Sequence, residues 1–166
     1  KCLKRGIKVT IVVGDKTAND FYIPPGQKFN RIGGLPYLYE MILRKFVKAN
    51  QKFIDAGLLE LRLWRHQDNS FHLKGLSVDA QRHLFTGHNL NPRAFALDFE
   101  NAVLVQDELG QLQPQLQLEQ QHILENTQQI QHYTQIEMLK DYPEQVQKLL
   151  SKLKGIGADL VVKRLL

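Results

Sequence analysis

Residues 70–79 read SFHLKGLSVD, and they are the stretch that decides the fold of this chain. The alternating side-chain character of this stretch predicts a β-strand, whose successive side chains point to opposite faces of a sheet. His72 and Lys74 therefore project from one face, roughly 6.6 Å apart along the backbone. Asp79 points to the other face, where a structural, charge-pairing role suits it better than a chemical one.

An imidazole and an ammonium on one face can act together on a phosphorus atom. The imidazole attacks phosphorus, and the cation neutralises the charge that builds on the non-bridging oxygens. A second predicted strand, residues 83–89, ends in Asn89, whose amide can donate to a phosphate oxygen. Glu100, in a further strand, can accept a hydrogen bond from His72 and fix its tautomer. The alternative interpretation is a surface His and Lys on an ordinary strand.

Around this stretch, the hydrophobic pattern predicts an α/β layered domain. The expected elements are strands at 7–13, 58–64, 70–79, 83–89 and 96–106, and helices at 36–56, 113–134 and 141–155. The Gln-rich segment 113–134 could be a low-complexity tail, but its regularly spaced apolar residues favour a surface helix. We expect residues 1–112 to form one domain that carries the motif, with 113–166 as C-terminal helices packed on it or extending it.

Composition excludes several classes of protein. The 166 residues carry 22 Lys and Arg against 17 Asp and Glu, a net charge of +5. A single cysteine, Cys2, excludes a disulfide framework and a thiolate metal site. No apolar run approaches the roughly 18 residues of a membrane-spanning helix. The mild positive charge permits an anionic partner, whether nucleic acid, phospholipid headgroups or a phosphorylated small molecule.

The spacing His72-x-Lys74-x4-Asp79, followed by Asn89 and Glu100, resembles the HKD motif of the phospholipase D superfamily. That superfamily usually has Gly-Ser-x-Asn where residues 86–89 read TGHN, so no hydroxyl is available at position 87 while the Asn keeps its register. The longer stretch, TGHNLNPRA at 86–94 and LDFENA at 97–102, resembles the bacterial phosphatidylserine synthases of the phospholipase D type, the CDP-diacylglycerol–serine O-phosphatidyltransferases.

This resemblance implies a phospholipase D-like fold, with a mixed central β-sheet flanked by helices. It implies phosphatidyl transfer from CDP-diacylglycerol to L-serine, giving phosphatidylserine and CMP through a phosphatidyl-histidine. Members carry two HKD motifs in two pseudo-symmetric halves. We therefore expect this chain, which starts without a methionine, to be the C-terminal half, and an N-terminal half to supply the second motif. Neither a metal nor another cofactor is expected.

The resemblance also assigns roles to individual residues. The catalytic set it implies is His72, Lys74, Asp79, Asn89 and Glu100. In that set, Lys74 and Asn89 bind phosphoryl oxygens and Glu100 orients His72, which is either the nucleophile or the acid/base. Asn91 and Arg93 are expected to contact the pyrophosphate or cytidine, with a surface salt bridge as the alternative for Arg93. The remaining histidines are expected to be surface or packing residues: His66, His83, His122 and His132.

The expected surroundings are the cytoplasm and the inner membrane, with peripheral association and no nucleic acid. The Gln-rich helix and a basic C-terminal tail are candidates for contact with an anionic membrane, and a solvated helix is the alternative. The basic residues in question are Lys148, Lys152, Lys154, Lys163 and Arg164. Other readings of the motif are a phospholipase, a cardiolipin synthase, a phosphodiesterase nuclease, or a basic binding module without catalysis.

Overall fold

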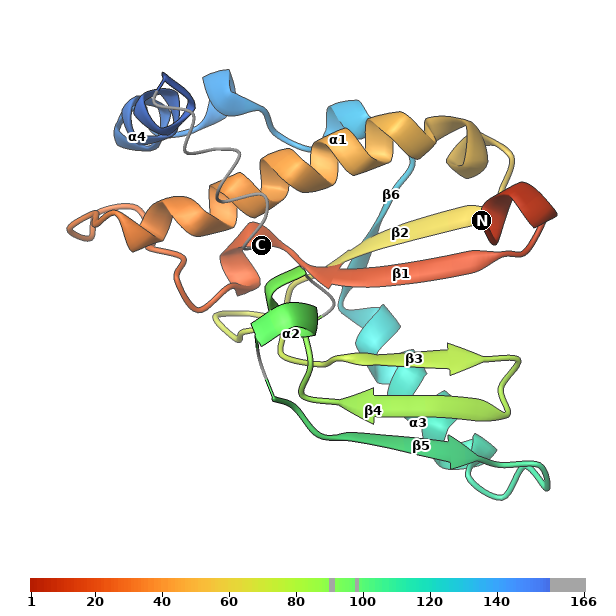
Figure 1. Cartoon of the computed structure of the whole chain (residues 1–166). Coiled ribbons are helices and arrows are strands. Elements are labelled where there is room, and N and C mark those ends of the chain that lie inside the picture. The colour runs from red at the N-terminus through yellow and green to blue at the C-terminus, as the bar shows by residue number, and fades with distance from the viewer. Residues whose placement is uncertain (90–91, 98, 156–166) are drawn as a thin grey trace. The chain divides into compact units, whose positions relative to one another are not determined.

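A computed structural model describes residues 1–89, 92–97 and 99–155 of the chain (Figure 1). The side chains described exclude those of residues 92, 93, 97, 154 and 155. The chain divides into two compact units, one made of residues 1–71 and 123–152 and the other of residues 72–122 and 153–166. Among the described residues, no helix is both long enough and apolar enough to cross a bilayer.

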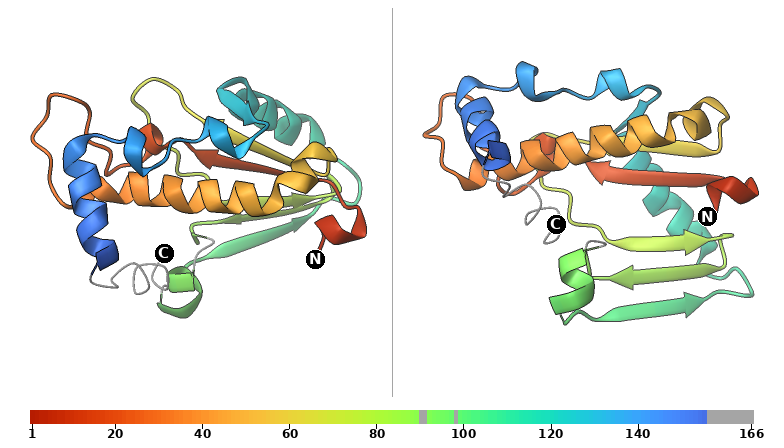
Figure 2. Two further views of the ribbon diagram at one scale, coloured as in Figure 1. Left: turned by 90° about the horizontal axis from the view of Figure 1, so that it is seen from above. Right: turned by 45° about the horizontal axis from the view of Figure 1, so that its top comes forward.

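The described part of the first unit contains a mixed three-stranded sheet. Strand β1 (Val9–Gly14) runs parallel to β2 (Leu59–Trp64), and β6 (Thr127–Ile130) pairs antiparallel on the other side of β2. A parallel pair needs a long crossover, and helix α1 (Leu35–Asp55) supplies it. Figures 1 and 2 show α1 lying along the sheet.

The core of this unit lies between α1 and the sheet. Val47 of α1, Leu61 of β2, Ile130 of β6 and Ile136 are 0–2% exposed and cluster together. Helix α4 (Glu144–Gly155) packs close to the start of α1, because a Cβ on Gly34 would lie 2.6 Å from a methyl carbon of Leu149. Segments that are far apart in the sequence therefore pack together in one hydrophobic layer.

The second unit holds an antiparallel sheet of three strands within its described residues. Its strands are β3 (Gly75–Val78), β4 (Arg82–Thr86) and β5 (Ala102–Gln106), in that order. Helix α2 (Pro92–Leu97) connects β4 to β5, and α3 (Gln113–Glu125) follows β5. Figures 1 and 2 show α2 at the end of the sheet where β4 finishes.

The predicted α/β class, with a mixed sheet and flanking helices, is confirmed, as are the helices expected at 36–56 and 141–155. Four of the expected elements are wrong in part. The strand expected at 70–79 covers only Gly75–Val78, and the strand expected at 83–89 covers Arg82–Thr86. The strand expected at 96–106 begins only at Ala102, because α2 occupies 92–97 and starts with a proline, the favoured first residue of a helix. The helix expected at 113–134 ends at Glu125, and Thr127–Ile130 form β6 instead.

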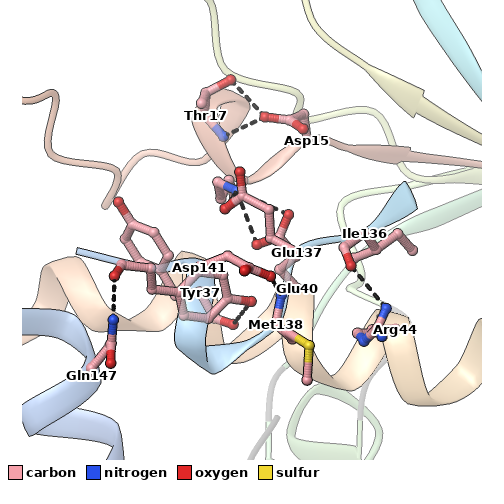
Figure 3. A network of polar contacts seen from close by, with 12 residues as sticks. Asp15, Thr17, Tyr37, Glu40, Arg44, Ile136, Glu137, Met138, Asp141 and Gln147 are labelled. Atoms are coloured by element: carbon pink, nitrogen blue, oxygen red, sulfur yellow. Dashed lines mark hydrogen bonds and ion pairs between the residues drawn. The ribbon is translucent and has the colours of Figure 1, made fainter. Parts of the chain in front are cut away.

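A half-buried lysine holds three segments of the first unit together, and Figure 3 shows the two carboxylates that it pairs with, those of Glu40 and Glu137. The Lys16 ammonium lies 3.0 Å from Glu40 of α1 and 2.6 Å from Glu137. It also lies 5.8 Å from the ring centre of Tyr37 and 5.6 Å from that of Tyr142. Lys16 is only 13% exposed and Glu40 only 8%, so water screens this pair weakly.

The network shifts the proton affinity of its members. Burial alone lowers the pKa of Lys16, but the carboxylates of Glu137 and Glu40 outweigh it, so the pKa ends above the ordinary 10.5. Burial raises the pKa of Glu40 by more than Lys16 lowers it. Burial and the Glu40 charge raise the pKa of Tyr142 above its ordinary value of 10.0. The folded protein therefore keeps the lysine charged and the phenol neutral in alkaline solution.

Lys16→Met should lower the free energy of unfolding by about 3 kcal/mol, because it leaves the Glu40 carboxylate buried without its cation. Lys16→Met/Glu40→Leu should return to within about 1 kcal/mol of the wild type, since it removes both charges. Urea unfolding of the four proteins of this cycle measures both changes. Equal losses in the single and the double variant would contradict the assigned pairing.

The same network sets an expected pH dependence. Lys16 and Tyr142 both hold their protons more tightly in the folded state, so the free energy of unfolding falls as pH rises above their ordinary pKa values of 10.5 and 10.0. The lysine contribution is complete below 10.5 and is lost as pH passes its raised pKa. The double variant should show a shallower alkaline slope in urea midpoints measured between neutral pH and pH about 11.

Candidate active site

His72 and Lys74 lie in contact immediately before β3. The Lys74 ammonium donates a hydrogen bond to Nδ1 of His72 at 3.2 Å, and the His72 side chain is exposed while Lys74 is half-buried. An ammonium has only donors, so this contact requires the tautomer in which Nδ1 accepts and Nε2 carries the proton. The expectation that both side chains share one side of the chain is confirmed, although the strand itself starts three residues later than residue 72.

Backbone contacts bring three segments to one edge of the second unit's sheet. The Thr86 N–H donates to the carbonyl of Lys74 at 3.2 Å, and the Thr86 hydroxyl donates to the carbonyl of Asn101 at 3.0 Å. The Gly87 N–H points to that same Asn101 carbonyl at 3.4 Å. Because the strands are antiparallel, the start of β3, the end of β4 and the start of β5 meet there. We call this the reactive edge, residues 72–74, 86–89 and 99–101.

Glu100 reaches across the reactive edge to Gly87. A Cβ placed on Gly87 would lie 2.7 Å from Oε2 of Glu100, closer than real Cβ contacts allow. The Glu100 carboxylate therefore occupies the space of a side chain at position 87. This contact is a physical reason for glycine at the position where the resembled superfamily usually has serine.

Asn89 and His88 complete the edge beyond β4. The His88 N–H donates to the Thr86 hydroxyl at 2.9 Å, which turns the chain after the strand. The His88 ring packs edge-on against Phe95 of α2, with ring centres 4.5 Å apart. Asn89 follows in an exposed, irregular segment. The strand expected at 83–89 therefore ends at Thr86.

The other expected site residues do not join this group. Asp79 lies beyond the far end of β3, in a turn where Asp79 and Ala80 have φ of +52° and +53°. Five residues of extended chain separate it from Lys74, about 16 Å. The catalytic assignment of Asp79 therefore has no support in the geometry, and a structural part in the turn fits its place. Asn91 lies outside the described residues, as does the side chain of Arg93.

Thr86 and Asn101 both fix the reactive edge, and neither was among the expected site residues. Nothing in their residue types marks them, since their role depends on which strands become neighbours. The position of α2 did have a signal, because Pro92 favours the first turn of a helix. His83, expected to be a surface or packing residue, is 2% exposed in β4 and contacts the Ser77 hydroxyl through Nδ1 at 2.9 Å.

The reactive edge offers an imidazole, a cation, a carboxylate and an amide. These groups match what a phosphodiester needs: a nucleophile or acid/base, and donors for the non-bridging oxygens. Within the described residues, no three His, Cys, Asp or Glu side chains gather closely enough to hold a metal ion.

Residues 1–136 match the family model described as "Cardiolipin synthase, PLD-like domain", and the chain belongs to this phospholipase D-like family. Two curated relatives are similar to nearly the whole chain. A CDP-diacylglycerol–serine O-phosphatidyltransferase of Haemophilus influenzae is 52% identical, and one of Escherichia coli is 48% identical, each over 164 residues. A crystal structure of phosphatidylserine synthase from Haemophilus influenzae superposes with a TM-score of 0.93 at 52% identity.

These alignments cover 99% of this chain but only part of each relative. The chain spans 36% of the length of both curated relatives and 37% of the crystallised one. The similarity therefore establishes the family and the fold of this segment, about a third of the relatives' length.

The contact between His72 and Lys74 predicts an imidazole whose Nδ1 accepts and whose Nε2 carries the proton. Imidazole ¹⁵N chemical shifts at slightly alkaline pH should show this tautomer for His72. Lys74→Met should remove the preference, because the donor to Nδ1 is lost. His66→Ala is the control that identifies one of the other ring signals without changing that of His72. An Nδ1-protonated ring in the unmodified protein would contradict the contact.

Proposed function

We propose that the full-length protein transfers the phosphatidyl group of CDP-diacylglycerol to L-serine and releases CMP. The observation that carries this proposal is the contact of the Lys74 ammonium with the His72 imidazole at the reactive edge, 3.2 Å apart. The names of the two curated relatives, at 52% and 48% identity, support the choice of lipid donor and of serine as acceptor.

The proposed reaction has two displacements at phosphorus. An imidazole nitrogen attacks the phosphatidyl phosphorus, a P–N bond forms, and the bond to the CMP oxygen breaks while a second histidine protonates that oxygen. The second histidine then takes the proton of the serine hydroxyl, whose oxygen attacks phosphorus and releases the imidazole. Two in-line displacements retain the configuration at phosphorus. His72 provides one of these two imidazoles, and the second HKD motif of an N-terminal half provides the other.

Lys74 has a part in both binding and tautomer choice. Its ammonium donates to Nδ1 of His72 in the free site, and a phosphate oxygen is a stronger acceptor for the same charge. Where His72 is the nucleophile, substrate binding draws the ammonium to that oxygen, one water molecule takes the Nε2 proton and another gives a proton to Nδ1. The Nδ1–H then donates a hydrogen bond to the Glu100 carboxylate. Nε2 is then left with the lone pair that attacks. A cation held in place for the developing charge contributes a few kcal/mol, about 3 to 4, to the lowering of the barrier.

The remaining residues are assigned to substrate contacts. Asn89 donates to a phosphoryl oxygen, and Asn91 and Arg93 contact the pyrophosphate or the cytidine. Arg suits that task because its planar fork can donate two parallel hydrogen bonds to one phosphate group.

The partners we propose are the N-terminal half of the same protein and an anionic membrane surface on the cytoplasmic side. Lys148 and Lys152 of α4 are both exposed, although Lys148 also pairs with Glu144 at 2.5 Å. Each basic side chain near an anionic surface contributes about 1 kcal/mol to association.

A second candidate function is the transfer of the same phosphatidyl group to a different alcohol. The description of the matched family model, which names cardiolipin synthase, favours it. The chemistry at phosphorus and the roles of His72 and Lys74 are unchanged, and only the leaving group and the acceptor differ.

Labelled L-serine and CDP-diacylglycerol, incubated with the full-length protein, should give labelled phosphatidylserine, and labelled CMP should exchange into the donor lipid. His72→Ala should lower turnover at least 1,000-fold with the melting temperature unchanged, because one of the two imidazoles is lost. His66→Ala, at an exposed histidine of the first unit, is the matched control and should keep full turnover.

Each outcome separates the candidates. Product formed with a phospholipid alcohol and not with serine would replace serine as acceptor and keep the chemistry. Cleavage of nucleic acid with neither lipid reaction would overturn the lipid assignment. Full turnover in His72→Ala would overturn the catalytic role of the reactive edge.

Gly87→Ala tests whether the place of the Glu100 carboxylate matters. The new methyl group displaces Oε2, a flexible chain end, so we expect a loss of unfolding free energy below about 1 kcal/mol. Turnover should fall at least tenfold, because the carboxylate is displaced from the position in which it is proposed to orient His72. In a Gly87→Ala/Glu100→Ala double-mutant cycle, Gly87→Ala should cause no further loss of turnover once Glu100 has been replaced by Ala. Additive losses would show that Gly87 acts independently of Glu100.

A further inference from the structure

The backbone is hydrogen-bonded on both sides of His72. The Phe71 N–H donates to the carbonyl of Ala18 at 2.9 Å, and the carbonyl of Lys74 accepts from the Thr86 N–H at 3.2 Å. The His72 side chain is exposed, so burial does not hold the ring in place. The position of the imidazole therefore depends on the backbone that enters and leaves residue 72.

The residues that hold Phe71 belong to the first unit, as Phe71 itself does. The Phe71 ring packs against that of Trp64, the last residue of β2, with ring centres 5.1 Å apart. A Cβ on Gly14, the last residue of β1, would lie only 3.1 Å from the Cβ of Phe71. Gly14 has no positive φ, so the close approach of Phe71 is the reason for glycine there. We call Gly14, Ala18 and Trp64 the Phe71 anchor.

The turn that carries the Ala18 carbonyl is itself held at several points. The Asp15 N–H donates to the Trp64 carbonyl at 2.8 Å, which ties the start of the turn to β2. The Asp15 carboxylate accepts from the N–H and the hydroxyl of Thr17, at 2.9 and 2.7 Å. Lys16, in the same turn, makes the two ion pairs described above, and Ala18 is only 4% exposed. The acceptor carbonyl is therefore fixed to the end of the first unit's sheet.

We propose that Phe71 is a positioning residue, which fixes the backbone from which the His72 imidazole reaches phosphorus. The inference rests on the proposed function. A reacting group must be held within about 0.5 Å of its productive geometry, and a misplacement of about 1 Å costs roughly 100-fold in rate. The planar peptide bond between residues 71 and 72 passes any shift of Phe71 on to the His72 backbone. Phe71 acts through His72 and takes no part in the chemical steps.

Kinetics of the full-length protein test this role. Phe71→Ala should lower kcat at least tenfold and change KM less than twofold, because the imidazole is misplaced while the substrate contacts remain. Phe71→Leu keeps most of the apolar bulk and should stay within threefold of the unmodified kcat. Phe53→Ala is the matched control, since Phe53 is a half-buried phenylalanine in the last turn of α1, shortly before β2 begins. It should lower the melting temperature and keep the kcat of the folded molecules.

Gly14→Ala displaces Phe71 without removing any side chain. The new methyl group should push Phe71 away by a few tenths of an ångström. We expect kcat to fall at least threefold while KM and the melting temperature stay close to those of the unmodified protein. A purely structural role for the Phe71 anchor would not separate kcat from stability in this way.

A signal measured without substrate separates this inference from the proposed function. The Cε1–H resonance of the His72 ring, assigned with His72→Ala, should shift or broaden in Phe71→Ala and in Gly14→Ala. It should stay unchanged in Phe53→Ala. If the unmodified protein neither forms phosphatidylserine nor exchanges CMP, the proposed function fails, and these resonances still decide the positioning.

Three results would overturn the inference. The first is a His72 resonance that neither Phe71→Ala nor Gly14→Ala changes. The second is an equal loss of kcat in Phe71→Ala and Phe53→Ala, and the third is a rise in KM with kcat unchanged. If Phe71→Ala does not fold, Gly14→Ala decides, and an unchanged kcat or an unchanged resonance in that variant rejects the positioning role.

Discussion

The antiparallel pairing of β3, β4 and β5 is the constraint on which the candidate site depends. The register that places Val78 opposite Arg82 also continues to Lys74 and Thr86, whose backbone groups bond at 3.2 Å. The register between β4 and β5 likewise continues to the contact of Gly87 with Asn101. A slip of one residue in either pair would turn every side chain to the opposite face. Groups from three separate segments therefore reach one edge only in this register.

The side chains of residues 87 and 100 compete for the same space at this edge. Glu100 fills the volume beside the Gly87 backbone, so the carboxylate and a side chain at position 87 exclude each other. A hydroxyl at 87 would add a donor and lose the present place of the carboxylate. In the segment TGHN, the Thr86 hydroxyl therefore hydrogen-bonds to the backbone of Asn101 and of His88, and Gly87 leaves room for the Glu100 carboxylate. Departures from a motif at neighbouring positions are therefore best interpreted together.

Local pattern was enough for some elements and not for others. The apolar spacing of residues 36–56 predicted α1, because a long amphipathic helix is encoded within its own sequence. The Gln-rich Thr127–Ile130 became a strand because β2, more than sixty residues earlier, offers an unpaired edge, and no local pattern records that. Alternation predicted that His72 and Lys74 share one side of the chain, and their contact agrees with this, although both precede the strand. It did not predict the end of the strand at Val78, since the positive φ of Asp79 and Ala80 departs from ordinary residue preferences.

Under the proposed function, with His72 as the nucleophile, the position of Lys74 links substrate binding to the readiness of the imidazole. Without substrate, its ammonium donates to Nδ1 and keeps His72 in the tautomer whose Nε2 carries a proton, a poor nucleophile. An anionic oxygen competes for that ammonium and wins, because a charged acceptor binds it more strongly than a neutral ring nitrogen. The ring then exchanges its donor for an acceptor, a role that the proposal gives to Glu100, whose carboxylate lies against Gly87 at the same edge. Under this proposal one cation both binds the phosphate and withholds the nucleophile from water until a phosphate is present.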